Sequence, residues 1–398
     1  MDMLKGLRVV DLTSVIAGSF GSMLLGDLGA DVVKIEPPGG EHYRYAMDGA
    51  ILIAMNRNKR GVVLDLRKPE GQDIALRLAR QADVFIENLK PGTTARLGLG
   101  YEDVARINPG IVYCSVSGFG QSGPDSERPA YDPLVQARSG IMMATGEPDG
   151  WPVRQVTSLV DMTASLYASS AILASLLHRE KTGKGQRIDV SLMDSAVSAM
   201  GYYLTHYSFT GKRPQRVGSG HATWAVFQAF DTKDGPVWVG AGTDRFWAAF
   251  CGALGLDDLL HDKRFATGAS RREHRRELLE RVDEVCRRYT GAELEQKLVE
   301  AGVPCSRLLT IDEVPDDPQV QYRGLIEEWD YADKGRIQVV RSPIMLSGHL
   351  PETRLRSPQL GEHTVEVLRE LGYSAADIQE FLDKDVAFQY QAHSTHAQ

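Results

Sequence analysis

The sequence predicts an α/β protein with a large Rossmann-like parallel-sheet domain and a smaller α+β domain. Over the first third of the chain, short apolar strands alternate with helices, as they do in βαβ units with right-handed crossovers. Near residue 225 this alternation gives way to a hairpin and highly charged helices. A chain of 398 residues is also long for a single hydrophobic core, which favours two domains.

The first βαβ unit consists of a strand at Leu7–Leu12, a helix within Thr13–Gly29 and a strand at Ala30–Glu36. The alternation then continues with strands at Asn56–Leu66, Asp83–Asn88, Ile111–Val116 and Gln186–Leu192, and with helices at Pro69–Gln81, Tyr101–Ile107, Tyr131–Met143 and Met193–Phe209. In sheets of this kind, ligands bind beyond the carboxyl ends of the strands.

A long apolar helix is expected from Asp161 to His178, before Gly183. Its expected buried stripe is Leu166, Ala171, Ile172, Ala174 and Leu177. An Asp in the first turn faces free backbone N–H groups, which stabilise the ionised carboxylate and would keep it able to act as a nucleophile. An ordinary N-cap Asp, worth about 1 kcal/mol to the helix, fits the same pattern.

The smaller domain is predicted between two parts of the larger one. A hairpin is expected over Val226–Phe230 and Val237–Ala241, followed by a helix at Asp244–Leu254 and a charged helical stretch at Arg271–Ala301. Ile337–Val340 and the helices Glu362–Leu371 and Ala375–Leu382 indicate a return to the large domain. The predicted bounds are 1–210 for the first part of the large domain, 211–224 for a linker, 225–325 for the small domain and 326–398 for the return.

Composition restricts the possible partners. The net charge of −8 argues against a general nucleic-acid or anionic-membrane binder. The N-terminus shows no signal peptide, and the most apolar segments are interrupted by Asp, so we expect a cytoplasmic protein without a membrane span. The cysteines have no paired metal spacing, which predicts reduced thiols and no metal site.

Basic residues gather near the expected strand ends of this acidic protein. They are Arg57, Lys59, Arg60, Arg67, Lys68, Lys90 and Arg96. Such a cluster suits a ligand with several phosphates, such as coenzyme A or a nucleotide.

The G-x-G-x-x-G run at Gly118–Gly123 is followed by Pro124 and Asp125 where a helix should begin, so we interpret it as a turn-rich loop. His221 lies in a Gly-rich linker and fits a structural histidine or a general base.

Several motifs resemble the class III CoA-transferases, the family of formyl-CoA transferase and carnitine CoA-transferase. They are Gly6-Leu-Arg-Val-Val-Asp-Leu-Thr, Ala30-Asp-Val-Val-Lys-Ile-Glu-Pro-Pro-Gly, Ala82-Asp-Val-Phe-Ile-Glu-Asn-Leu-Lys-Pro-Gly, Ser117-Gly-Phe-Gly-Gln-Ser-Gly-Pro, Lys181-Thr-Gly-Lys-Gly-Gln and Leu360-Gly-Glu-His-Thr. The resemblance covers nearly the whole chain.

The resemblance implies a metal-free enzyme that moves CoA from an acyl-CoA donor, with succinyl-CoA as the inferred donor, to a carboxylate acceptor. It implies that Asp161 is the nucleophile, with anhydride and aspartyl-CoA thioester intermediates, and that backbone amides and Tyr131 hold the developing charges. It places CoA contacts at Val15, Ile16, Ala17, Leu64, Asp65, Leu66, Arg67, Asn88, Leu89, Lys90, Arg96 and Tyr131. It also implies an interlocked, ring-like homodimer and no tightly bound cofactor.

Some positions depart from the family patterns. Ile16 stands where formyl-CoA transferase has glutamine, and Pro37 where it has a basic residue. That enzyme's run of four glycines is also missing, which argues against oxalate and formyl-CoA as substrates. The related α-methylacyl-CoA racemases have a histidine where Tyr131 stands, so a racemase would lack one acid/base group.

A small dicarboxylate acceptor would suit Arg128, Arg138, Arg154 and Arg216, although each fits a structural ion pair equally well. A racemase or epimerase and a non-catalytic CoA-binding homologue are the alternatives to a transferase.

Overall fold

The computed structural model describes residues 2–331 and 334–390. The chain divides into two compact units. Among the described residues, the first contains 2–139, 155–202, 322–331 and 334–390, and the second contains 140–154 and 203–321. Residues 140–154, which the sequence-based division put in the large domain, thus cluster with the second unit. The predicted domain bounds stay a prediction, because compactness alone does not show which parts fold independently.

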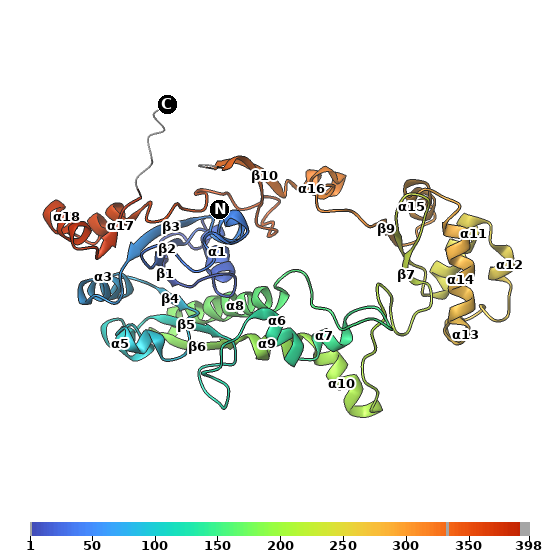
Figure 1. Ribbon diagram of the computed structural model, residues 1–398, viewed down its shortest axis with the longest axis horizontal. Coiled ribbons are helices and arrows are strands. Elements are labelled where there is room, and N and C mark those ends of the chain that lie inside the picture. Colours follow the sequence, from blue (N-terminus) through green and yellow to red (C-terminus); the bar gives the residue numbers. More distant parts are fainter. Residues whose placement is uncertain (1, 332–333, 391–398) are drawn as a thin grey trace. The chain divides into compact units, whose positions relative to one another are not determined.

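The first unit is built on a seven-stranded sheet with the order β12-β3-β2-β1-β4-β5-β6 (Figure 1). Its strands are β1 (Arg8–Leu12), β2 (Asp31–Glu36), β3 (Lys59–Leu64), β4 (Val84–Glu87), β5 (Val112–Ser117), β6 (Gln186–Ser191) and β12 (Ala387–Phe388). All neighbouring strands are parallel except β12, which pairs antiparallel with β3. The predicted α/β class with a large parallel sheet is therefore confirmed, and the order from β3 to β6 is that of doubly wound nucleotide-binding folds.

Helices cover both faces of this sheet (Figure 1). One face carries the main apolar core, to which Val10, Ile35 and Phe85 contribute from three strands. The helices on that face are α3 (Pro69–Arg80), α5 (Tyr101–Ile107), α17 (Thr364–Glu370) and α18 (Ala375–Asp383). The other face is covered by α1 (Ser19–Asp27) and by the long helix α8 (Leu159–Thr182), which pack against each other.

The prediction for the buried stripe of α8 was right for Ile172 and wrong for its leucines and for Ala174. Leu166 and Leu177 are exposed, at 50% and 60%, and Ala174 is exposed as well. The buried face instead consists mainly of small residues, namely Ala164, Ser165, Ala168 and Ser169, with Ile172 and Leu176. Small residues are needed because α1 approaches closely, and a Cβ atom at Gly21 would lie 3.0 Å from the Ser165 carbonyl oxygen.

Helix α8 is long and apolar enough to cross a membrane by length and composition alone. Such a segment is weak evidence for a membrane span, because the core helix of a globular protein passes the same test. Here α8 packs against α1, β5 and β6, as a core helix does.

Several element bounds differ from the prediction. The stretch expected as one helix from Met193 to Phe209 is divided at Met200, and the stretch from Tyr131 to Met143 is divided at Gly140. The resulting helices are α9 (Leu192–Ala199), α10 (Gly201–Thr210), α6 (Asp132–Arg138) and α7 (Ile141–Ala144). Residues 337–340 belong to β11 (Gly335–Val340), which pairs with β10 (Ile326–Tyr331) outside the large sheet.

Shorter elements complete the first unit, namely η1 (Ala46–Gly49), α2 (Ala50–Met55) and α4 (Thr93–Arg96). Helix α16 (Pro318–Arg323) lies where the chain passes back from the second unit to the first.

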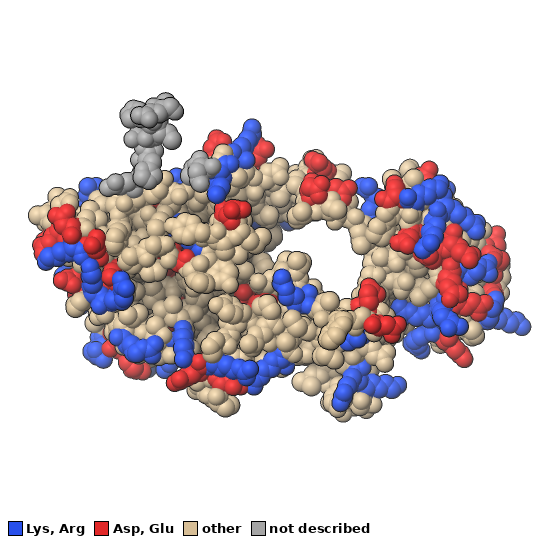
Figure 2. Space-filling view, in the orientation of Figure 1, with Lys and Arg blue, Asp and Glu red and all other residues tan. Residues whose placement is uncertain are grey.

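The second unit has its own sheet and core. The sheet has the order β7-β8-β9, with antiparallel strands β7 (Phe227–Phe230), β8 (Val237–Gly240) and β9 (Cys305–Arg307), so the predicted hairpin is confirmed. The helices are α11 (Asp244–Leu254), α12 (Asp257–Leu260), α13 (Gly268–Glu273), α14 (Arg275–Cys286), α15 (Gly291–Glu300) and η2 (Val314–Asp316), together with α7 and residues 203–210 of α10. On the face in Figure 2, charges of both signs cover this unit densely.

Candidate active site

A cleft opens where the strand order changes direction, between the adjacent strands β1 and β4. The chain passes from β1 outward to β2 and β3, and later fills the other half of the sheet with β4, β5 and β6. At such a switch point the loops beyond the strands diverge and leave room for a ligand. The cleft has a volume of about 160 Å³. Its lining residues are Ser14, Val15, Ala17, Asn88, Val116, Ser117, Gly118, Ala130, Tyr131, Asp161 and Leu192.

One wall of the cleft belongs to the loop Thr13–Gly18, which we call the switch loop. Asn88, the residue after β4, accepts a hydrogen bond from the Ser14 N–H and donates one to the Ser14 carbonyl, both at 2.8 Å. The same amide group also donates to the carbonyl of Ala17. The predicted contact residue Asn88 therefore ties the loops after the two central strands together.

The switch loop is also tied to α8, the helix that carries Asp161. The Ser165 hydroxyl accepts a hydrogen bond from the Gly18 N–H at 3.0 Å and donates to the Asp161 carbonyl at 2.9 Å. The wall of the cleft and the backbone of the candidate nucleophile are thus held by one side chain.

Asp161 lies inside the first turn of α8 rather than at its cap. The helix begins at Leu159 after Ser158, whose side chain makes no capping hydrogen bond. The donors at this helix end are bound by Asp132, whose carboxylate accepts the N–H groups of Val160 at 2.8 Å and of Asp161 at 3.2 Å. The hypothesis that Asp161 is an N-cap is wrong, because Asp132 performs that function from α6.

The electrostatic prediction for Asp161 was also wrong. The side chain is 9% exposed, and burial together with the nearby Asp132 carboxylate raises the pKa of Asp161 from its ordinary value of 3.8 to about 7. Burial disfavours the charged form, and a neighbouring negative charge disfavours it further. The helix end does not offset these effects, because Asp132 takes its N–H donors. A carboxylate of this kind is poorly solvated and reactive when ionised.

Tyr131 lies directly before α6 and also lines the cleft. Its side chain is 58% exposed, so the phenol can reach a bound molecule. The next residue, Asp132, is buried and accepts a hydrogen bond from the side-chain amide of Gln136 at 2.5 Å. The start of α6 therefore supplies both a hydroxyl group to the cleft and the carboxylate that caps α8.

The predicted CoA contacts occupy two kinds of position. Val15, Ala17, Asn88 and Tyr131 line the cleft with Asp161. The others lie at or after strand ends on the same edge of the sheet. Ile16 is in the switch loop after β1. The end of β3 carries Leu64, Asp65, Leu66 and Arg67, and the segment after β4 carries Leu89, Lys90 and Arg96. The Arg67 guanidinium binds the Asp65 carboxylate at 2.8 Å and is exposed, as are Lys90 and Arg96. These contact assignments stay predictions.

Part of the predicted basic cluster does not lie at the ligand edge. Arg57, Lys59 and Arg60 are at the amino end of β3, opposite to the ends that form the cleft. Arg57 and Lys59 bind the buried carboxylates of Asp27 and Asp11, with N–O distances of 2.6 and 2.8 Å, and Arg60 binds three carboxylates. These three side chains are structural ion pairs.

The arginines considered for a second substrate carboxylate all make contacts with other groups of this chain. Arg128 and Arg138 both pair with Asp125, at 3.9 and 2.5 Å. Arg216 donates to backbone carbonyls that include that of Gly150 at 2.9 Å, and Arg154 also has a contact. Their role toward a substrate stays untested.

His221 belongs to the second unit. Its ring stacks on Trp224 with centroids 4.8 Å apart, and its Nδ1 atom lies 3.0 Å from the Thr223 hydroxyl. These contacts fit the interpretation of His221 as a structural residue. None of them supports a role as a general base.

Alternative nucleophiles and metal ligands are weaker candidates. Burial raises the pKa of all four cysteine thiols, which keeps them protonated and poorly nucleophilic. Across residues 2–331 and 334–390, no group of three or more His, Cys, Asp and Glu side chains has an arrangement that could hold a metal ion.

Asp132 and Ser165 were missed in the sequence, and so was Glu41, whose carboxylate accepts the Val15 N–H. Asp132 acts on a helix end 29 residues away, so no local spacing indicates the contact. The one available signal for Asp132 was its position directly after Tyr131, a residue that had already been singled out.

Comparisons with known families, sequences and structures all match most of this chain. Residues 4–364 match the family described as CoA-transferase family III. The chain is 36% identical to human succinyl-CoA:glutarate CoA-transferase, covering 98% of this chain and 91% of that protein. It is 38% identical to acetyl-CoA:oxalate CoA-transferase of Acetobacter aceti, covering 92% and 95%. A crystal structure of a CAIB/BAIF family protein from Brucella suis matches 93% of this chain and 99% of that one, with a TM-score of 0.85 at 36% identity.

Proposed function

The chain belongs to CoA-transferase family III, and from that premise we propose that it moves CoA from an acyl-CoA to a small dicarboxylic acid, with Asp161 as the covalent carrier. The enzyme class follows from the family, whose members use acyl-CoA as a substrate. The observation that carries the proposal for Asp161 is its position in the cleft at the switch point, beside the loops after β1 and β4.

The proposed reaction has four steps. The Asp161 carboxylate attacks the thioester carbonyl and displaces CoA thiolate, which gives an acyl-aspartyl anhydride. The thiolate then attacks the aspartyl carbonyl, releases the first acid as its carboxylate and leaves CoA on Asp161 as a thioester. The incoming carboxylate attacks this thioester and again displaces the thiolate, giving a second anhydride. Attack of the thiolate on the acyl carbonyl of that anhydride forms the new acyl-CoA and restores the Asp161 carboxylate.

The side chains around Asp161 support this assignment. A buried carboxylate loses little solvation when it attacks, and the elevated pKa of Asp161 indicates that its charged form is poorly stabilised before the reaction. The Tyr131 hydroxyl and backbone N–H groups beside the cleft would stabilise the oxyanions that form in each step. One thioester replaces another, so the exchange needs no ATP.

Dicarboxylates are proposed as acceptors because the names of two relatives include glutarate and oxalate. Succinyl-CoA is the proposed donor, on the same kind of evidence. The sequence departures at Ile16 and in the missing glycine run argued against oxalate, whereas the 38% identity to an oxalate enzyme keeps oxalate among the acceptors to be tested.

The racemase alternative finds no support in the cleft. Among the residues that line it in the described part of the chain, Tyr131 and Asp161 have titratable side chains and none is a histidine. A two-base racemase needs a second group able to take a proton from carbon.

We also propose that the protein is a homodimer located in the cytoplasm. The exposed apolar side chains Leu166, Tyr167 and Leu177 along α8, with Val197 on α9, support an interface with a second copy. The resemblance to an interlocked dimeric family points the same way.

The test is transfer in heavy water. Wild type and Asp161→Asn are incubated with succinyl-CoA and separate acids, including glutarate, oxalate and a monocarboxylic control, and each acyl-CoA is followed by mass spectrometry. New dicarboxyl-CoA species that the variant does not form are expected. Deuterium at the α-carbon of an added branched acyl-CoA, with no new thioester, would instead establish the racemase.

A further inference from the structure

The backbone of the switch loop adopts an unfavourable conformation at Val15. Val15 has a φ angle of 61°, in the left-handed region that β-branched residues avoid. Val15 lines the cleft with Asp161, so its conformation decides where this wall of the cleft lies. Strain of this kind persists only where surrounding groups impose it.

Glu41 accepts a hydrogen bond from the backbone of Val15. It lies in the loop after β2, and its carboxylate accepts the Val15 N–H with an N–O distance of 2.5 Å. The Glu41 side chain is almost fully buried, at 4% exposure. A hydrogen bond to an ionised acceptor is among the stronger ones in proteins, and a buried one is strengthened further.

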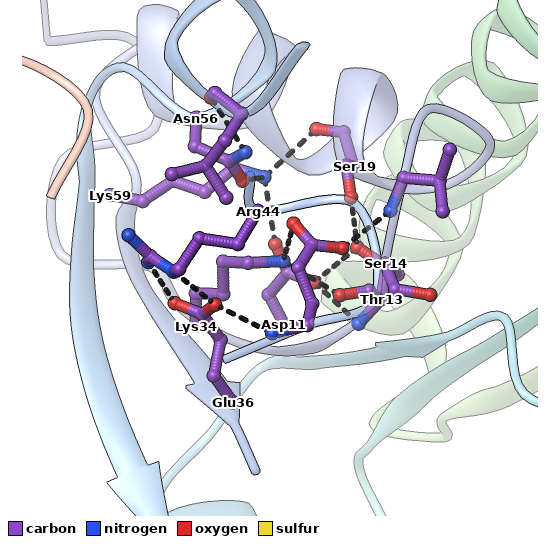
Figure 3. Close-up of polar contacts among 12 residues, drawn as sticks. Asp11, Thr13, Ser14, Ser19, Lys34, Glu36, Arg44, Asn56 and Lys59 are labelled. Atoms are coloured by element: carbon purple, nitrogen blue, oxygen red, sulfur yellow. Dashed lines mark hydrogen bonds and ion pairs between the residues drawn. The ribbon is translucent and has the colours of Figure 1, made fainter. Parts of the chain in front are cut away.

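A buried lysine joins Glu41 to the preceding residues of the loop. The Lys34 ammonium lies 3.5 Å from the Glu41 carboxylate and donates to the Thr13 carbonyl at 2.7 Å. Beneath it, Asp11 accepts the Thr13 N–H at 2.8 Å and binds the Lys59 ammonium at the same distance (Figure 3). The switch loop is therefore attached to a charged network between the sheet and α1.

We propose that Glu41 is a positioning residue for CoA transfer, which holds the cleft wall opposite Asp161 in place through the Val15 N–H, with Lys34 orienting its carboxylate. This inference rests on the proposed function. Glu41 does not line the cleft, so its effect on the reaction passes through the switch loop.

The test compares two neutral side chains of similar size. Glutamine at position 41 keeps an oxygen that can accept the Val15 N–H, whereas methionine fills the same space without an acceptor. Both lose the charge that faces Lys34. We expect kcat/KM for the acyl-CoA to fall at least tenfold more in Glu41→Met than in Glu41→Gln, with rates normalised to the folded fraction. Equal rates in the two variants, whether both high or both low, would overturn the positioning role.

Asp27→Asn serves as the control for lost stability. Asp27 is buried and binds Arg57 and Asn58, away from the residues that line the cleft. Its replacement should lower Tm and leave kcat/KM per folded molecule unchanged.

Amide exchange of the wild type keeps the proposal testable if Glu41→Met does not fold. The Val15 amide should exchange only with global unfolding, because a buried carboxylate holds it. Fast exchange of this amide in the folded protein would overturn the proposal. A wild type without any CoA transfer would refute the proposed function itself, whereas active wild type with equal Glu41 variants refutes only the role of Glu41.

Discussion

At the scale of single residues, the site depends on two carboxylates with opposite tasks. Asp132 binds the N–H groups at the start of α8, and Asp161 lies in the cleft without those donors. The negative charge of Asp132 contributes to the raised pKa of Asp161. The cap that fixes the helix therefore also tunes the candidate nucleophile.

Replacing Asp132 with Asn should make Asp161 more acidic. The wild-type pH profile of kcat/KM is expected to fall on the acid side with a pKa of about 7, because Asp161 must be ionised to attack. Asparagine can still accept the N–H groups of α8 but carries no charge, so this limb should move to lower pH. The measurement is the pH–rate profile of both proteins, with Asp27→Asn as a control. An acid limb that stays in place would contradict the assignment.

The same pKa makes a prediction about stability. A carboxyl group whose folded pKa is raised from 3.8 to about 7 favours folding below its unfolded pKa, and this contribution is lost as the pH rises through about 7. The loss has an upper limit of about 4 kcal/mol. Asp161→Asn should thus unfold at a higher temperature than wild type at pH 8, and the difference should vanish near pH 4. Thermal unfolding at both pH values tests this, and a variant less stable at pH 8 would count against it.

At the scale of elements, close packing of α1 against α8 positions Asp161. The helices meet through Gly21 on one side and through Ser165 and Ser169 on the other. The Ser165 side chain then connects α8 to the switch loop. Any change that separates these helices should displace Asp161 relative to the loop.

Gly21→Val should destabilise the protein and reduce transfer. A Cβ atom there would lie 3.0 Å from the Ser165 carbonyl and 3.1 Å from the Ser169 hydroxyl, so α8 would have to move. Overpacking of this kind costs about 1–3 kcal/mol. Gly252→Ala in α11 is the matched control, because its Cβ would meet nothing within 4 Å and should stabilise the helix by about 0.5–1 kcal/mol. Denaturant unfolding and kcat/KM of both variants would measure the contrast. Equal effects of the two substitutions would refute the packing argument.

The elements differ in how well the sequence predicts them. The buried parallel strands were predictable because both faces are covered, which makes each strand an apolar run. The face of α8 was not, because the usual preference for buried leucine is reversed where two helices approach closely. The roles of Asp132 and Glu41 could not be predicted from the sequence for a different reason. Each acts on backbone N–H groups that only the folded chain brings near, 29 and 26 residues away.

At the scale of the whole molecule, α8 presents apolar side chains on both of its faces. Its small residues pack on α1, whereas Leu166 and Leu177 are exposed in the single chain. An exposed apolar surface on a core helix favours burial against another protein. The proposed homodimer would supply that cover.

Leu166→Glu with Leu177→Glu should therefore give a monomer. Both leucines are exposed at 50% or more, so their replacement does not disturb the core of the single chain, but two buried charges would oppose an interface. Light scattering coupled to size-exclusion chromatography measures the mass, with Leu355→Glu as a control for an exposed leucine of the first unit outside α8. A wild type that is monomeric at micromolar concentration would refute the dimer.

The central claim is that Asp161 carries CoA during the reaction. The most direct measurement is peptide mass spectrometry of the protein after incubation with succinyl-CoA and rapid quenching at low pH, without an acceptor acid. CoA attached by a thioester to the peptide that contains Asp161, absent from Asp161→Asn and lost when glutarate is added, is the predicted result. Transfer that continues in Asp161→Asn, or CoA attached to any other residue, would contradict the account.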